Sequence, residues 1–234
     1  MVSQAIMLTK MGLGNLLKDL VAPVNCLGCG EEGGWICDSC RRELTASRPE
    51  SCVICDKAAD NGICPKCQER VPLDGVVSLF SYAEPVIQDL VQQAKYGGHF
   101  DALSFYADTF RRHYLRRLPH SEWTVVPIPI HQKRLAKRGF NQSEVLSQRM
   151  FAGREEVSNL LKRKNDTPAQ AKLTKTKRLT NVHGCFAYVG TKEIPENILL
   201  VDDVITTGAT LGEAAILLRR KGAKTVWAIT IAHG

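Results

Sequence analysis

The segment that decides the fold reads Ile198-Leu199-Leu200-Val201-Asp202-Asp203-Val204-Ile205-Thr206-Thr207-Gly208-Ala209-Thr210-Leu211. Its four leading apolar residues predict a buried strand, and the spacing of apolar residues after Thr207 predicts a helix. A short turn rich in Thr and Gly connects the two. In an open α/β sheet, ligands bind beyond the carboxyl ends of the strands, which is where this turn would lie.

The chemistry of this turn favours a ligand that is both phosphorylated and rich in hydroxyls. Backbone N–H groups and the helix dipole at residues 208–211 predict a pocket for an anion. Asp202 and Asp203 would repel the same phosphate, but carboxylates accept hydrogen bonds from sugar hydroxyls and bind Mg²⁺. We therefore predict a ribose 5-phosphate group as the ligand. The alternative is a plain strand, turn and helix with capping threonines and two exposed acids.

The rest of the C-terminal part alternates between strand and helix patterns. Strands are expected at Val76–Tyr82, Trp123–Ile130, Asn159–Leu161, Asn197–Val201 and Thr225–Ala232. Helices are expected from Pro85 to Gly97, around Leu103 and Phe110, and at Gln142–Met150 and Thr207–Lys221. This alternation predicts an α/β fold with a mainly parallel sheet flanked by helices.

Eight of the nine cysteines form four Cys-x-x-Cys pairs in the first third of the chain. The pairs are Cys26/Cys29, Cys37/Cys40, Cys52/Cys55 and Cys64/Cys67. Each pair presents two thiolates on one side of a turn, so two pairs complete one tetrahedral zinc site. The cysteines therefore predict two structural Zn²⁺ sites, with no coordination position open for catalysis. Residues 22–70 have few large apolar side chains, which indicates that this segment needs the metal to fold.

The four pairs can combine sequentially or in an interleaved cross-brace, and the gaps between the pairs favour one of these. Seven residues separate the first two pairs and eight separate the last two, which resembles an internal repeat and favours sequential over interleaved pairing. An iron–sulfur cluster and a redox dithiol are the alternatives to zinc.

Charge and hydropathy restrict the partners and the compartment. The 234 residues carry a formal net charge of +7, and residues 131–180 alone hold 13 Lys/Arg against 4 Asp/Glu. This favours phosphates or nucleic acid as partners, with a solvated basic face as the alternative.

No stretch approaches the roughly 20 apolar residues of a membrane span. The N-terminus predicts a short amphipathic helix and not a signal peptide, so we expect a cytoplasmic protein.

The segment Ile198–Thr210 resembles the motif with which type I phosphoribosyltransferases bind phosphoribosyl pyrophosphate (PRPP): four apolar residues, two acids and Thr-Gly-x-Thr. The whole chain resembles the ComF family, which includes GntX-like DNA-utilisation proteins. The other matching features are the double cysteine ribbon, Val126-Pro127-Ile128-Pro129, Arg134, Lys137-Arg138-Gly139-Phe140-Asn141-Gln142 and a series from Arg163 to Phe186. The resemblance implies an N-terminal helix at 1–21, a double zinc ribbon at 22–70 and a phosphoribosyltransferase-like domain at 71–234.

By this resemblance, Asp202 and Asp203 would hold the ribose hydroxyls, and Mg²⁺ would accompany PRPP. The residues implied to cradle the 5-phosphate are Thr206, Thr207, Gly208, Ala209 and Thr210. Ile128 would lie at the pyrophosphate loop, with Arg134 and Arg138 on the diphosphate, and the loop from Arg163 to Arg178 would be a lid. Asp202, Asp203 and Arg138 are the implied catalytic residues.

The resemblance also implies a role in competence, through uptake or utilisation of external DNA, with DNA-import proteins and single-stranded DNA as partners. One hypothesis is a Mg²⁺-dependent phosphoribosyltransferase. The alternative is a non-enzymatic PRPP sensor or a single-stranded DNA-binding accessory factor. Thr206 stands where purine-type transferases carry an acid, so the acceptor of any transfer stays open.

Overall fold

The computed structural model describes residues 24–44, 50–96, 102–113, 115–119, 122–153, 155–165, 183–191 and 193–234. The chain divides into two compact units, the first ending at Leu44 and the second running from there to Gly234. The expected N-terminal helix over residues 1–21 lies outside the described residues, as do residues 166–178 of the expected lid.

The first unit is built on the first two cysteine pairs. Asn25 and Glu32 form an antiparallel bridge around the first Cys-x-x-Cys turn. Helix α3 (Asp38–Glu43) begins directly after Cys37, which is its N-cap. Among residues 24–44 only Cys26 and Ile36 are buried, so this unit has very little apolar core.

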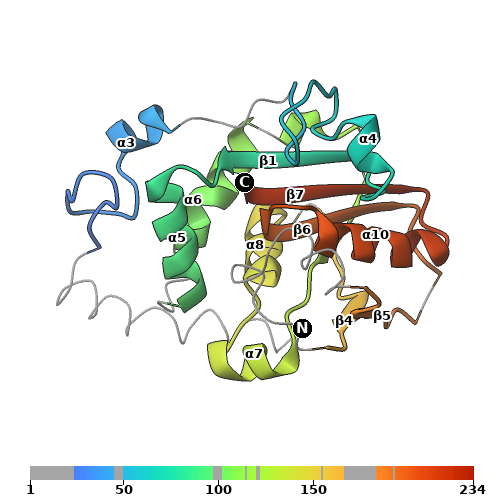
Figure 1. The fold of residues 1–234 in the computed structure, drawn as a ribbon. Helices are drawn as coiled ribbons and strands as arrows, with labels where there is room; N and C mark the ends of the chain where they lie inside the picture. Colours follow the sequence, from blue (N-terminus) through green and yellow to red (C-terminus); the bar gives the residue numbers. More distant parts are fainter. Residues whose placement is uncertain are drawn as a thin grey trace. The chain divides into compact units, whose positions relative to one another are not determined.

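A parallel sheet of five strands forms the centre of the second unit, in the order β1-β7-β6-β2-β3 (Figure 1). The strands are β1 (Gly75–Ser81), β2 (Thr124–Pro127), β3 (Glu156–Val157), β6 (Asn197–Ile205) and β7 (Thr225–His233). All four pairings are parallel, which confirms the predicted α/β class. A separate antiparallel pair joins β4 (Leu161–Arg163) to β5 (Phe186–Tyr188).

Helices pack on both faces of this sheet. They are α4 (Pro65–Gln68), α5 (Pro85–Tyr96), α6 (Ala102–His113), α7 (Gln132–Arg138), α8 (Gln142–Met150) and α10 (Ala209–Arg220), with a 3-10 turn η1 (Leu115–Arg117). Ile198 and Leu200 of β6 pack in one cluster with Leu211 and Leu218 of α10. Because side chains alternate along a strand, the next residues of β6 face the opposite layer, where α8 contacts β6 and β2.

The third and fourth cysteine pairs belong to the core of this second unit. Cys52, Cys64 and Cys67 are buried in the same cluster as Leu211 of α10. The backbone N–H of Val76, in β1, donates a hydrogen bond to the carbonyl of Asn61. The second ribbon is therefore packed against the sheet and α10.

Two buried tryptophans mark one face of the sheet. The ring of Trp227, on β7, covers Gly75 of β1, where an added Cβ would lie 2.6 Å from the indole. The ring centroid of Trp227 lies 6.5 Å from that of Trp123, which precedes β2. Gly75 is therefore required so that the indole can lie flat on the adjacent strand.

Several elements differ from the sequence expectation. Strands β3 and β5 are not among the expected strands, and β2 ends at Pro127 instead of Ile130. Strand β6 does not end at Val201 but runs through the acids to Ile205, because Asp202 and Val204 continue the ladder with β7. Helix α7 was not expected, and a strand expected at Asn159–Leu161 starts at Leu161 instead. In each case backbone pairing or capping outweighs the side-chain pattern.

Candidate functional site

Asp202 connects β6 with the start of α8. Its Oδ1 accepts hydrogen bonds from the hydroxyl of Ser143, at 3.2 Å, and from the backbone N–H of Asp203, at 2.9 Å. Ser143 is buried in the first turn of α8. The acid is thus held by a partner 59 residues away in sequence.

Asp203 is held by a cation that the sequence analysis did not identify. Its Oδ1 accepts the N–H of Val204 at 2.7 Å, and its Oδ2 lies 2.8 Å from the Nζ of Lys95, in the last turn of α5. Burial, the largest single effect, lowers the pKa of Lys95, but the charge and hydrogen bond of Asp203, together with Asp202 and Tyr82, outweigh it, and the net pKa is raised. Lys95 is therefore an ammonium at neutral pH. In the sequence, Lys95 is one lysine in the last turn of an amphipathic helix, and this position does not indicate an acidic partner.

The surroundings of Asp202 shift the pKa of its carboxyl group. Burial raises its pKa to about 7, and the adjacent carboxylate of Asp203 adds to the rise, while the N–H of Asp203, Lys95 and Ser143 oppose it. Near neutral pH the protonated and ionised forms of Asp202 are therefore both populated. The protonated carboxyl can donate as well as accept a hydrogen bond.

Replacing Asp202 by Asn is expected to stabilise the protein at pH 8 and to have a smaller effect at pH 5. The pKa of about 7 in the folded state lies above the ordinary aspartate value. The folded state therefore binds more protons between about pH 4 and 7, and the contribution of Asp202 to stability falls as pH rises through this window. The amide of the variant would have no charge to bury. Urea unfolding of both proteins at pH 5 and pH 8 measures the difference, and an identical pH dependence would contradict the assignment.

The turn between β6 and α10 packs on the second cysteine ribbon. Gly208 has a φ of +75°, in the left-handed region, and is the N-cap of α10. A Cβ on Gly208 would lie 2.9 Å from both Ile54 Cδ1 and Val71 Cγ2. Ile54 lies between Cys52 and Cys55, so the second ribbon supports this turn directly.

A shallow hollow that is open to solvent lies beside the turn, with a cavity volume of about 10 Å³, roughly the room that one water molecule needs. Its lining residues come from the end of β6 and the first turn of α10. They are Asp202, Val204, Ile205, Thr206, Gly208, Ala209, Thr210 and Leu211. Five residues predicted from the sequence therefore share one hollow: Asp202, Thr206, Gly208, Ala209 and Thr210.

The other predicted residues lie elsewhere. Thr207 does not line the hollow, and its hydroxyl accepts the N–H of Ala209 at 3.4 Å. Asp203 faces Lys95. Ile128 is buried, its N–H bonded to the carbonyl of Val201 and its carbonyl to the side chain of Asn141.

Arg134 and Arg138 lie on α7, a short basic helix that follows the end of β2. The Nη1 of Arg138 donates to Gln142 Oε1 at 2.6 Å, and its guanidinium lies over the ring of Tyr96, 5.1 Å from the centroid. Gln142 precedes Ser143, the partner of Asp202. Arg138 is thus connected to the acids through the first residues of α8, and it does not line the hollow.

The eight paired cysteines form two groups of four, in sequential order. The groups are Cys26, Cys29, Cys37 and Cys40, and Cys52, Cys55, Cys64 and Cys67. Within each group the sulfur atoms all lie within 4.8 Å of one another. Zn–S bonds of about 2.3 Å place tetrahedral sulfurs ~3.8 Å apart. The distances Cys29–Cys37 and Cys55–Cys64, both 3.6 Å, fit this value, so each group could hold one zinc ion.

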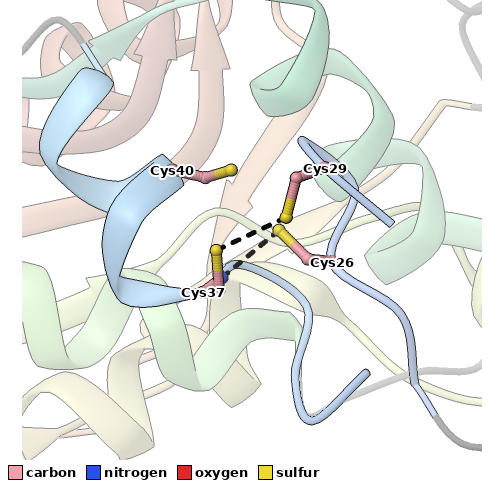
Figure 2. A group of neighbouring side chains, drawn as sticks. All are labelled: Cys26, Cys29, Cys37 and Cys40. Carbon is pink, nitrogen blue, oxygen red and sulfur yellow. Dashed lines mark hydrogen bonds between the residues drawn. The ribbon is translucent and has the colours of Figure 1, made fainter. Parts of the chain in front are cut away.

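In the first group the four side chains converge on one point (Figure 2), and the N–H of Cys37 donates to Cys26 Sγ at 3.3 Å. Burial alone would raise the pKa of Cys26, but N–H groups, that of Cys37 foremost, lower it to about 6. The N–H of Cys67 lowers the pKa of Cys64, in the second group, to about 7. The pKa of Cys40 is raised, chiefly by its neighbour Cys37, and that of Cys67 is raised, chiefly by burial. Each group therefore contains one thiol that ionises readily, and four thiolates together would need a cation to stabilise them.

Comparisons with known proteins return relatives of nearly the same extent. The chain is 31% identical over 222 residues to DNA utilization protein YhgH of Escherichia coli O6:H1, covering 82% of this chain and 93% of the relative. It is 33% identical over 176 residues to competence protein F of Haemophilus influenzae, covering 70% and 75%. It is 29% identical to competence protein ComFC of Streptococcus pneumoniae, covering 91% and 94%.

Comparisons with protein-family models and with solved structures add two findings. No protein-family model matches the chain. A hypoxanthine phosphoribosyltransferase from Staphylococcus aureus matches 55% of this chain and 61% of its own, with 11% identity and a TM-score of 0.33. In the part of the chain that the structure describes, no helix is both long and apolar enough to cross a membrane.

Proposed function

Because this chain belongs to the family of DNA utilization protein YhgH and competence protein F, we propose that it serves the uptake or utilisation of external DNA, and that its second unit binds PRPP. The observation that carries the PRPP proposal is that Asp202, Thr206 and residues 208–210 line one hollow. Carboxylates suit the ribose hydroxyls, and backbone N–H groups at the start of α10 suit the 5-phosphate.

Mg²⁺ would come to this site with the diphosphate of PRPP. Asp203 already pairs with Lys95, so the acids do not form an all-oxygen cage for a cation of their own. When bound, Mg²⁺ would neutralise charge on the diphosphate. Arg138, on α7, is the residue that we propose for the same charge from the protein side, since its guanidinium can bind phosphate oxygens in a bidentate manner.

Whether the protein transfers the ribosyl group or only senses PRPP is decided by its chemistry with an acceptor. Transfer would displace pyrophosphate at the anomeric carbon, and the groups available are electrostatic stabilisers. No carboxylate follows the acidic pair within the turn, where Thr206 stands. A screen for pyrophosphate release across nucleobases and nucleic acids separates the transferase from the sensor.

Calorimetric titration with PRPP and Mg²⁺ tests the binding proposal. We expect Asp202→Asn/Asp203→Asn to weaken binding by at least about tenfold, because charged acceptors to sugar hydroxyls are lost. The exposed Glu156 at the other end of the sheet gives a control, as Glu156→Gln removes an acid without touching the hollow. Absence of binding by the native protein, or unchanged binding by the double variant, would remove the sugar-phosphate claim.

A second role, contact with single-stranded DNA, is supported by α7 and its neighbourhood. Lys133 and Lys137 are exposed on α7, and the ring of Tyr96 beneath Arg138 is 71% exposed. Cations attract the phosphates, and an exposed aromatic ring can stack on a base. The same basic segment also contains Lys172, Lys175 and Lys177, which lie outside the described residues.

A further inference from the structure

Lys95 is a charged side chain that reaches the acidic pair from a distant part of the chain. It is in the last turn of α5, more than 100 residues before the acids, and its Nζ lies 2.8 Å from Asp203 Oδ2. Only a fifth of each side chain is exposed. A contact of this length between two largely covered groups is a charge-assisted hydrogen bond, stronger than a surface ion pair.

The contact with Lys95 gives the two carboxylates different partners and therefore different roles. Asp203 has one oxygen on the N–H of Val204 and the other on Lys95, so its plane is set by the protein. Asp202 uses Oδ1 for Ser143 and for the N–H of Asp203. Asp202, and not Asp203, lines the hollow. The pair therefore consists of one carboxylate that faces the ligand space and one that is neutralised from behind.

We infer that Lys95 is a positioning residue of the sugar site: it holds Asp203 by a direct ion pair and so leaves Asp202 to accept the ribose hydroxyls. This inference rests on the proposed PRPP site. The other titratable groups near the acids are Tyr82, in the turn after β1, and Tyr106, on α6, and burial raises the pKa of Tyr106 well above its usual value. A tyrosine hydroxyl carries no charge at physiological pH, so Lys95 is the compensating charge among the described groups that face the pair.

A positive charge is needed here because two adjacent carboxylates in a largely buried position repel each other, and this repulsion costs free energy. Without Lys95 their repulsion would grow, and the site would either hold an extra proton or move one acid toward solvent. In the first case one acid loses its charge as an acceptor for sugar hydroxyls, and in the second an anionic ligand meets more negative charge. A role limited to tethering α5 to the sheet would change stability without changing the affinity of the folded protein for either ligand.

Titration calorimetry with ribose 5-phosphate, and separately with PRPP and Mg²⁺, tests the inference on the full-length protein. We expect Lys95→Met to weaken both ligands by about tenfold or more, and Lys95→Arg to recover most of that loss. Lys162→Met, at an exposed position on β4, controls for the removal of one positive charge and should bind like the native protein. Circular dichroism and melting temperature verify that each variant is folded.

The outcomes separate the two proposals. If native protein binds neither ligand, the proposed function falls, and the sugar-site role of Lys95 falls with it. If native protein binds and folded Lys95→Met binds equally well, only the role of Lys95 is overturned.

A measurement without ligand tests the role of Lys95 independently, and it also works for a variant that binds ligand too weakly for calorimetry. Carboxyl ¹³C NMR of the aspartates follows the proton of Asp202, whose pKa is about 7 in the native protein. Loss of Lys95 should raise this midpoint by about one pH unit, and Lys95→Arg should restore it. A midpoint that is the same in Lys95→Met as in the native protein contradicts the inference.

Discussion

Replacing Cys55 by Ser is expected to unfold the second unit, whereas the matching Cys29→Ser leaves that unit intact. Both cysteines are exposed second members of a Cys-x-x-Cys pair, so the two changes are chemically alike. They differ in surroundings, because Cys52, Cys64 and Cys67 are packed in the core with α10 and the first group has almost no core. Structural zinc contributes about 10–16 kcal/mol to folding of a zinc-finger peptide, comparable with the ~5–15 kcal/mol stability of a whole domain.

Elemental analysis and scanning calorimetry measure the two effects. We expect two zinc ions per chain in the native protein, and one in Cys29→Ser with the melting transition of the second unit unchanged. In Cys55→Ser the transition should fall steeply or disappear. Equal melting transitions in the two variants would contradict the placement of the second ribbon in the core, and a native zinc content below two would contradict the double ribbon.

Replacing Gly208 by Ala is expected to weaken PRPP binding by about a hundredfold. Alanine at a φ of +75° is strained by about 1 kcal/mol. Its Cβ would also press on Ile54 and Val71 at 2.9 Å, and overpacking adds about 1–3 kcal/mol. The turn would have to move, which changes the N–H groups that we propose for the 5-phosphate.

Gly153→Ala provides the matched control, because Gly153 has a φ of +72° and nothing within 4 Å of an added Cβ. It carries the same backbone strain without the contact with the ribbon. We expect Gly153→Ala to lower the melting temperature by a few degrees and to bind PRPP normally in the same calorimetric titration. Equal binding by the two alanine variants would show that the packing of Gly208 on Ile54 does not support the site.

Much of the fold could be predicted because its signals are local. The apolar run before Asp202 and the helical spacing after Thr207 predicted β6 and α10, and the similar gaps of seven and eight residues favoured the sequential grouping of the cysteine pairs. Helix α7 has no apolar stripe to detect. It forms because His131 accepts the N–H of Lys133 at its start and Gly139 adopts a φ of +83° at its end.

The parts of the site that could not be predicted depend on contacts between distant segments. Lys95 meets Asp203 only because α5 ends at the same edge of the sheet as β6, and a lysine in a helix has no pattern that announces an acidic partner. The packing of Ile54 on Gly208 is of the same kind. Periodicity predicts which face of an element is buried, but it does not identify the residue that covers it.

The tryptophans give the protein its own optical reporters. Trp123 and Trp227 lie buried together in the second unit, and Trp35, the third, is in the first unit. Trp35→Phe would therefore leave fluorescence that arises from the second unit alone. Emission from a buried indole lies at shorter wavelength than from one in water, so the colour of that light would follow the opening of this unit without any attached dye.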